Sequence, residues 1–145
     1  MKLTEQAIER EGAAVTRLTR FLHGYAMWTL THLERAGLYS REWRYASDAH
    51  RSALSEQQRY YDRTLRRLII AGQGEGDLDS TVDPRQASLF ISAAFTGLPD
   101  WFPTDTISER ELVAANYVDL ALRACGEVPS SQPRAKPALA RKRTR

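Results

Sequence analysis

The stretch that decides the fold is residues 83–125, DPRQASLFISAAFTGLPDWFPTDTISERELVAANYVDLALRAC, which predicts two consecutive helices. The first of them begins with a complete start signal. Asp83 suits the N-cap position, Pro84 suits the first helical position, and Gln86 stands where a capping box places an amide or a carboxylate. A cap of this kind contributes about 1 kcal/mol to helix stability. We therefore expect a helix to begin directly after Asp83.

The second helix of the stretch has a start signal of its own. Ser108 and Glu111 have the spacing of a capping box, and Ile107 and Leu112 have the spacing of a hydrophobic staple. Its end is marked by Gly126, because glycine readily adopts the left-handed conformation that follows many helices. The sequence thus predicts a helical pair joined by a short corner rich in aromatic residues and proline.

Both helices of this pair are too apolar to lie side by side on a surface. Apolar side chains, many of them small, occupy more than one face of each helix. A chain of this size has few other elements to cover those faces. The pattern therefore favours a four-helix interface with a second copy of the chain, related by two-fold symmetry. A hairpin buried within one chain is the alternative that the sequence leaves open.

Length, composition and charge predict one globular domain with a basic tail. The 145 residues are 42% hydrophobic and 27% charged, no apolar run approaches membrane-spanning length, and the single cysteine, Cys125, fits a reducing, cytoplasmic compartment. Residues 127–145 carry six basic side chains and one acidic one, a net +5, which leaves −2 on residues 1–126 of the formal +3. A nucleic-acid-binding body would be basic, and this one is not. We expect residues 1–126 to form the domain, with 1–12 a remnant or linker, and residues 127–145 to be disordered.

The rest of the chain also has helical periodicity. Apolar residues recur at steps of three and four between residues 13 and 36, which predicts a long helix with a natural stop at Gly37. A second long helix is expected from Asp48 or Ser52 to about Ala71. Residues 72–77, GQGEGD, are expected to stop that helix and form a tight turn. Because no strand pattern appears, the prediction is an all-α bundle of about five helices.

The sequence contains no recognisable catalytic or metal-binding set. His23 and His32 are nine residues apart, which predicts different helix faces, and no HExxH or cysteine pair accompanies them. The glycines of residues 72–77 follow a helix, whereas a phosphate-binding loop follows a strand and opens a helix. Cys125 has no convincing set of partners for nucleophilic catalysis and is expected to be a small buried residue. We therefore expect no enzyme activity, no cofactor and no metal.

Aromatic residues in the first two long helices allow two interpretations. Phe21, Tyr25, Trp28, Trp43 and Tyr61 have the composition of a packed core, and the same residue types build an apolar ligand cavity when a few polar groups lie among them. The candidate polar groups are Thr29, His32, Gln58 and Arg44. Sequence alone leaves the core and the cavity open.

Several segments together resemble the C-terminal ligand-sensing and dimerisation domain of TetR-family transcriptional regulators, closest to the subgroup that controls sterol and fatty-acid catabolism. The resemblance covers most of residues 18–125, and its order and spacing are more specific than its parts. The segments that carry it are Arg41-Glu42-Trp43-Arg44, Tyr60-Tyr61 to Leu68-Ile69-Ile70, Gly72 to Asp77, Asp83-Pro84-Arg85, Gly97-Leu98-Pro99-Asp100-Trp101-Phe102, and Ser108 to Leu122.

The resemblance implies a role for particular residues. The effector site would contain Phe21, Tyr25, Trp28, Thr29, His32, Trp43 and Tyr61. The partner in a homodimer would meet Phe90, Ala94, Phe95, Val113, Tyr117, Leu120 and Ala121. Pro99 departs from many relatives and is expected to end the first dimer helix early. The family's N-terminal helix-turn-helix, which reads DNA, has no counterpart here, because residues 1–12 are too short for three helices.

Two functions from different classes are compatible with these observations. The first is an effector-sensing and homodimerisation domain of a TetR-like repressor, which binds a small hydrophobic or acyl-CoA-type ligand and reaches DNA only through a helix-turn-helix outside this chain. The second is a ligand-free helical module that dimerises, or forms heterodimers with full-length regulators. A filled core would favour the second function, and a ligand cavity would favour the first.

Overall fold

The computed structural model describes residues 12–33, 36, 47–102 and 107–127, without the side chains of 48–51, 53 and 54. These residues form helices α2 (Ala14–Thr31), α4 (Asp48–Glu75), α5 (Pro84–Thr96), α6 (Leu98–Trp101) and α7 (Ile107–Ala124), and they contain no strand. The all-α prediction of about five helices is confirmed. Trp43, Arg44, the predicted stop at Gly37 and the tail from residue 128 lie outside the described residues.

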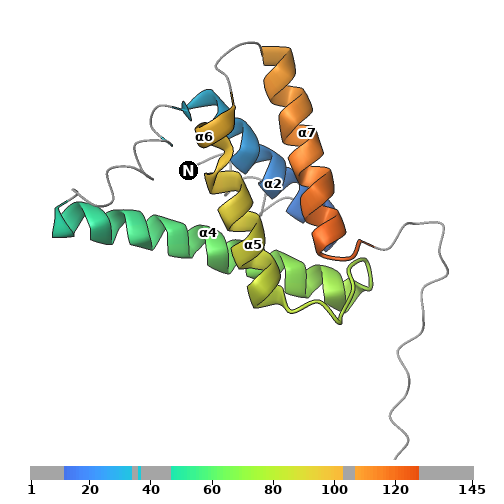
Figure 1. Ribbon diagram of the computed structural model, residues 1–145. Coiled ribbons are helices and arrows are strands. Elements are labelled where there is room, and N and C mark those ends of the chain that lie inside the picture. Colours follow the sequence, from blue (N-terminus) through green and yellow to red (C-terminus); the bar gives the residue numbers. More distant parts are fainter. Residues whose placement is uncertain (1–11, 34–35, 37–46, 103–106, 128–145) are drawn as a thin grey trace, which may run out of the picture.

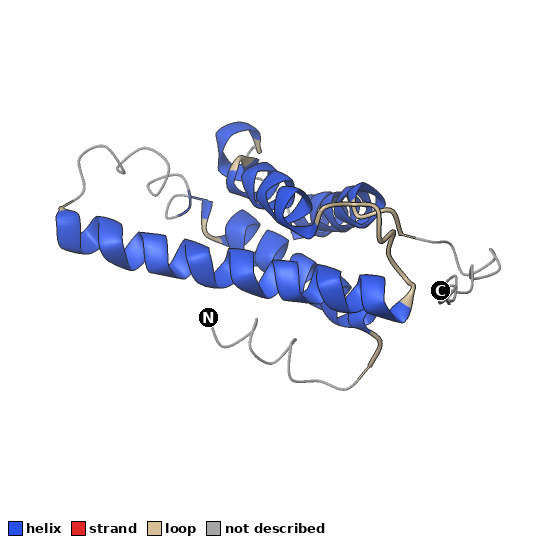
Figure 2. Cartoon of the chain, turned by 90° about the horizontal axis from the view of Figure 1, so that it is seen from below, coloured by secondary structure: helices blue, strands red, loops and turns tan. Residues whose placement is uncertain are grey.

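Helix α2 lies at the centre of the bundle. It packs against α4 on one side and α7 on the other, and α5 packs across α4 (Figure 1). Figure 2 shows the long α4 along one side of the molecule, with the other helices gathered against it. No helix among the described residues is long and apolar enough to cross a membrane. The core contains fully buried side chains from α2, α4, α5 and α6: Leu18, Phe21, Leu22, Leu30, Leu65, Ile69, Ile91, Phe95 and Leu98.

The start of α5 confirms the predicted cap, whereas the start of α7 differs from its prediction. The Asp83 carboxylate accepts a hydrogen bond from the Gln86 N–H over 2.8 Å, with Pro84 as the first helical residue. Helix α7 begins at Ile107, so Ser108 lies in its first turn and not at the N-cap. Ile107 and Leu112 are 75% and 63% exposed, so they do not form a packed staple in the protomer.

Two helix ends differ from the sequence prediction. Helix α2 ends at Thr31 and not at residue 36, because His32 leaves the helical conformation and its N–H bonds back to the carbonyls of Trp28 and Thr29. Helix α5 ends at Thr96, and Pro99 lies in the first turn of the short α6, where proline is favoured. The early end of the first dimer helix is therefore confirmed.

Helix α4 extends four residues beyond its predicted end, through Gly72 and Gly74. A Cβ at Gly72 would lie 2.7 Å from Cδ1 of Leu78, so this glycine makes room for a buried side chain and does not stop the helix. The helix ends only at Gly76, which has φ +78°. The N–H groups of Asp77 and Leu78 then bond back to the Gly72 carbonyl, over 3.0 and 3.2 Å.

The end of α7 confirms the predicted glycine cap. Gly126 has φ +66°, and the Glu127 N–H bonds to the Leu122 carbonyl over 3.1 Å, which satisfies a carbonyl at the helix end. The Asp79 N–H lies 3.3 Å from the Cys125 carbonyl and 3.1 Å from the Gly126 carbonyl. These contacts attach the loop after α4 to the end of α7 and close this end of the bundle.

Candidate functional site

A small cavity lies where α2, α4 and α5 meet, and it gathers four of the residues predicted for the effector site. Its volume is about 80 Å³. The predicted residues in its wall are Tyr25, Trp28, Thr29 and Tyr61. The wall is completed by Ala36, Gln57, Gln58 and Thr96. The three helices therefore form a cavity as well as a core at this point.

Stacked aromatic rings form one side of this cavity. The rings of Tyr25 and Tyr61 are nearly parallel, at 7°, with centroids 4.9 Å apart. The Tyr25 ring also stacks on the Phe95 ring, with centroids 5.4 Å apart. Tyr25 belongs to α2, Tyr61 to α4 and Phe95 to α5. Because each ring comes from a different helix, the stack couples the positions of the three helices around the cavity.

The Tyr25 hydroxyl is a buried polar group in the cavity wall. The pKa of Tyr25 is raised to about 12, chiefly by burial. The charges of the nearby Tyr61 and Asp62 contribute to this rise, and hydrogen bonds with the Thr96 and Gln58 side chains oppose it. Asp62 itself accepts a hydrogen bond from the Ser92 hydroxyl over 2.6 Å, which links α4 to α5. The Tyr25 hydroxyl therefore stays protonated at neutral pH and remains able to donate a hydrogen bond.

The other predicted effector-site residues lie elsewhere. Phe21 is fully buried behind Tyr61, with ring centroids 6.0 Å apart, and belongs to the core. His32 lies beyond the end of α2, where its ring stacks on Trp28 at 5.1 Å and its Nδ1–H donates to the Trp28 carbonyl over 2.8 Å. Trp43 lies outside the described residues. Neither Phe21 nor His32 lines the cavity.

Sequence reasoning missed Gln57 and Thr96 in the cavity wall. Thr96 ends a helix that the sequence assigned to the dimer interface, and its hydroxyl also donates to the Ser92 carbonyl. The available signal was the occurrence of Ser92 and Thr96, four residues apart, in an otherwise apolar helix. Gln57 precedes the predicted Gln58 on α4, and only the packing of α2 against α4 brings both amides to the cavity.

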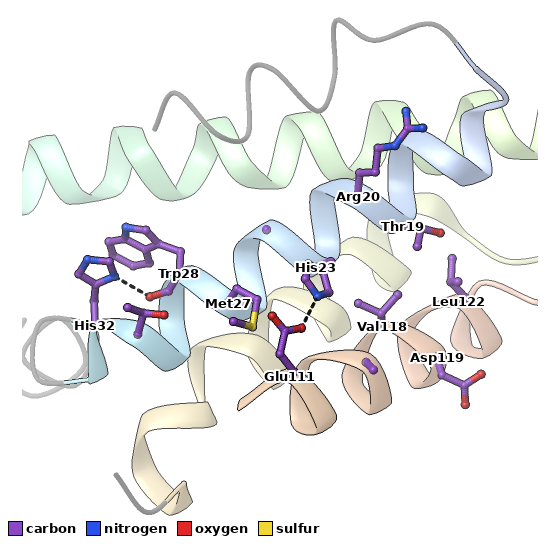
Figure 3. A pocket seen from close by; sticks show the side chains of 13 residues that line it. Thr19, Arg20, His23, Met27, Trp28, His32, Glu111, Val118, Asp119 and Leu122 are labelled. Carbon is purple, nitrogen blue, oxygen red and sulfur yellow. Dashed lines mark hydrogen bonds and ion pairs between the residues drawn. The ribbon is translucent and has the colours of Figure 1, made fainter. Parts of the chain in front are cut away.

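A larger groove of about 840 Å³ runs between α2 and α7 (Figure 3). His23 and Glu111 face each other across it, with Nε2 3.1 Å from a carboxylate oxygen, and Met27 and Val118 contribute apolar walls. His32 also lines this groove, which corrects the prediction that His23 and His32 point to different faces. The helical spacing does not apply to His32, because the helix has already ended at Thr31.

Exposed large apolar side chains are concentrated on α5, α6 and α7. Six of the seven such side chains among the described residues lie there: Leu89, Phe90, Trp101, Ile107, Leu112 and Leu120. The seventh, Ile70, is on α4. Tyr117 of α7 connects the helices, because its ring meets Phe95 edge-on at 5.5 Å and stacks on Trp101 at 6.0 Å. A concentration of exposed large apolar side chains on neighbouring helices favours an interaction site.

The comparisons with known proteins agree with this architecture. Residues 11–125 match the protein family described as tetracyclin repressor-like, C-terminal domain. The chain belongs to this family. Such domains sense ligands and dimerise within TetR-family transcriptional regulators, which are not enzymes.

Two solved structures of TetR-family regulators resemble this domain. A bacterial regulatory protein of the tetR family from Rhodococcus RHA1 is 29% identical, with a TM-score of 0.78, over 88% of this chain and 67% of that one. A transcriptional regulator of the TetR/AcrR family from Thermobifida fusca YX-ER1 is 20% identical, with a TM-score of 0.68, over 83% of this chain and 67% of that one, and it supports the fold alone. No curated protein matches the chain.

The TetR-like domain presents most, but not all, of the residues predicted for the dimer interface. Phe90 and Leu120 are exposed, and Ala94, Val113 and Tyr117 are partly exposed. In contrast, Phe95 and Ala121 are buried within the protomer and are not available to a partner. Each helix has a core face directly beside its exposed face, and these two side chains lie on the core face. We therefore assign Phe95 and Ala121 to the core.

Metal and thiol chemistry find no support in the described residues. Within them, no group of three or more His, Cys, Asp or Glu side chains is placed to hold a metal ion. Cys125 is fully buried as the sequence predicted, and burial raises the pKa of its thiol to about 11. A thiol in this state is a poor nucleophile at neutral pH.

Proposed function

We propose that this chain senses a small hydrophobic or acyl-CoA-type effector and forms the homodimer of a transcriptional repressor, of the kind that controls sterol or fatty-acid catabolism. The single observation that carries the sensing role is the cavity between α2, α4 and α5, whose aromatic wall contains a buried hydroxyl. In this proposal the repressor acts in the cytoplasm and contacts DNA through a helix-turn-helix domain.

The homodimer in this proposal is supported by the exposed apolar face of α5–α7. Two protomers would bring these helices together as a four-helix interface around a two-fold axis. Its central contacts would be made by Phe90, Ala94, Val113, Tyr117 and Leu120. An apolar face of this kind is typical of the core of a homodimer interface.

A continuous series of aromatic contacts supports coupling between the effector cavity and the dimer face. Starting in the cavity, ring contacts of 4.9–6.0 Å join Tyr61, Tyr25, Phe95, Tyr117 and Trp101. A ligand that displaces the Tyr25 ring would be felt at Tyr117 through Phe95. Binding would then favour one arrangement of the two protomers over another, as a coupling free energy between sites requires.

Calorimetric titration tests the sensing role. We expect short- and medium-chain acyl-CoA thioesters, or hydrophobic small molecules, to bind the wild-type domain, and Tyr61→Ala to weaken that binding at least tenfold. Gly74→Ala is the matched control on α4, because Gly74 is exposed and a Cβ there meets no atom within 4 Å. A library without one binding compound would contradict the sensing role.

The coupling is tested by comparing two fully buried phenylalanines. Phe95→Leu interrupts the ring series, whereas Phe21→Leu leaves it intact, and both remove similar buried volume. We expect effector binding to change the dimer dissociation constant in the wild type and in Phe21→Leu but not in Phe95→Leu. Equal coupling in all three proteins would refute this route.

The alternative function, a ligand-free module that pairs with full-length regulators, is favoured by one observation. The cavity of about 80 Å³ is well below the 300–1,000 Å³ typical of ligand sites. In that case the domain would form heterodimers through the same apolar face, and no small molecule would raise its melting temperature. Mixing experiments with a tagged full-length regulator, followed by light scattering, separate the two functions.

A further inference from the structure

The described wall of the cavity contains no charged side chain. Its polar groups are the hydroxyls of Tyr25, Tyr61, Thr29 and Thr96, the amides of Gln57 and Gln58, and the indole N–H of Trp28. All of them are neutral at physiological pH. A ligand that carries a charge would therefore find hydrogen bonds among these residues but no counter-ion.

A negative charge lies close to the cavity. Asp62 neighbours Tyr61 on α4, and its charge acts on the Tyr25 hydroxyl, whose pKa it helps to raise. The Ser92 hydroxyl holds the Asp62 carboxylate over 2.6 Å, which fixes the position of this charge. An anionic ligand would thus be repelled at the same point where it loses its hydration. Burial of an ionised carboxylate without a partner costs far more than a neutral hydrogen bond contributes.

A neutral polar group, in contrast, has suitable partners. The Tyr25 hydroxyl, Thr96 hydroxyl and Gln58 amide lie within one hydrogen-bonded set. The Tyr25 hydroxyl and the Gln58 amide can either donate or accept, whereas the Thr96 hydroxyl donates to the Ser92 carbonyl and is left as an acceptor. A hydroxyl, amide or carbonyl group of a ligand can join this set whichever role it takes. The stacked rings of Tyr25 and Tyr61 beside it provide an apolar surface for the remainder of the molecule.

The size of the cavity restricts what can enter it. An engineered cavity of about 150 Å³ binds benzene, so a cavity of about 80 Å³ accepts only part of a larger molecule without rearrangement. The part that enters is about the size of an amide or a short alcohol. The rest of such a ligand would lie along Trp28, which lines the cavity and is itself partly exposed.

Resting on the proposed effector role, we propose that this cavity selects an uncharged ligand, whose hydroxyl, amide or carbonyl group bonds to the Tyr25–Gln58–Thr96 set and whose apolar part lies against Tyr61 and Trp28. The cavity discriminates against carboxylates of the same shape.

Three small molecules of similar shape test the charge rule at pH 7: butyramide, butyrate and butylammonium. Their binding to the wild-type domain is measured by ligand-observed NMR titration, which detects weak complexes. We expect butyramide to bind at least tenfold more tightly than butyrate, and butylammonium, which the Asp62 charge attracts, to bind more tightly than butyrate. Tyr25→Phe, which removes only the hydroxyl, should weaken butyramide about fivefold, in line with the loss of roughly 1 kcal/mol for one neutral hydrogen bond.

Placing a cation in the cavity wall should reverse the preference. Gln58→Lys exchanges an amide of the wall for an ammonium group on a helix that tolerates lysine well. We expect this variant to bind butyrate more tightly than butyramide. Ser52→Lys is the matched control, because it adds the same charge to an exposed position of α4 away from the cavity wall, and it should keep the wild-type preference.

The outcomes separate this inference from the proposed function. Butyrate binding to the wild type as tightly as butyramide, or an unchanged preference in Gln58→Lys, overturns the charge rule and leaves an effector site in place. Butyramide binding unaffected by Tyr25→Phe overturns the assigned hydrogen bond. Failure of all three molecules to bind the wild type overturns the charge rule together with the effector site itself.

Discussion

The proposed dimer face makes the sharpest prediction for this protein, at Phe90. Its side chain is 65% exposed in the protomer, so a partner has most of the ring left to cover. With about 200 Å² for a phenylalanine side chain and about 25 cal/mol per Å², full coverage corresponds to about 3 kcal/mol for each copy. A two-fold axis places two copies in one interface. Phe90→Asp removes this contribution twice and places two carboxylates in an apolar contact.

The resulting change in affinity is large. Even if the partner covers only half of this area, the substitution lowers the favourable free energy of dimerisation by about 3 kcal/mol, which raises the dissociation constant more than a hundredfold. Sedimentation velocity over a range of micromolar concentrations measures the dissociation constant directly. We expect the wild type to sediment as a dimer and Phe90→Asp as a folded monomer with unchanged helical circular dichroism.

Ile70→Asp is the matched control for this experiment. Ile70 is also a large apolar residue, 51% exposed, but it lies on α4 and not on the dimer face. We expect this variant to remain dimeric. The reasoning is refuted if the wild type is a monomer at micromolar concentration, if Phe90→Asp changes the dissociation constant less than threefold, or if Ile70→Asp dissociates the dimer equally well.

Three further predictions concern the fold. Gly72→Ala places a Cβ 2.7 Å from Leu78 and should lower the free energy of unfolding by about 1–3 kcal/mol in urea titrations, whereas Gly74→Ala, with open space around it, should raise it by about 0.5–1 kcal/mol. Asp83→Ala removes the bond to the Gln86 N–H and should cost about 1 kcal/mol in the same assay; an unchanged midpoint would contradict the cap. Cys125 should resist thiol reagents at pH 8 until the protein is unfolded. Because burial raises the pKa of this thiol from 9.0 to about 11, the unfolded chain ionises first, so stability should fall as the pH rises through that interval and less so in Cys125→Ala.

Local signals in the sequence were reliable where the physics is local. The Asp83 cap depends on residues three apart, and the glycine cap at Gly126 depends on one backbone conformation, so both were predictable. Gly72 shows the limit of this reasoning. A glycine near the end of a helix was interpreted as its stop, but the residue is required by the side chain of Leu78, which only the folded chain brings against it.

The residues of the candidate site were also predictable only in part. Aromatic residues at helical spacing predicted that Tyr25, Trp28 and Tyr61 would lie on inner faces, and they do. The role of Thr96 was not predictable, because it reaches the cavity from a helix that the sequence assigned to the dimer. His32 was a candidate polar group of the site, but it lies beyond the end of α2 at Thr31 and does not line the cavity.

The sequence by itself determined that this protein is an all-α domain with an apolar pair of helices near its C-terminus, the first of them capped by Asp83, because caps and apolar periodicity act over a few residues. Only the tertiary structure decided which faces of that pair remain exposed. The packing of α2 and α4 buries Phe95 and Ala121 and leaves Phe90 and Leu120 outside. The same packing leaves a cavity at the Tyr25 hydroxyl, since a cavity depends on how three helices fit together and not on any one of them.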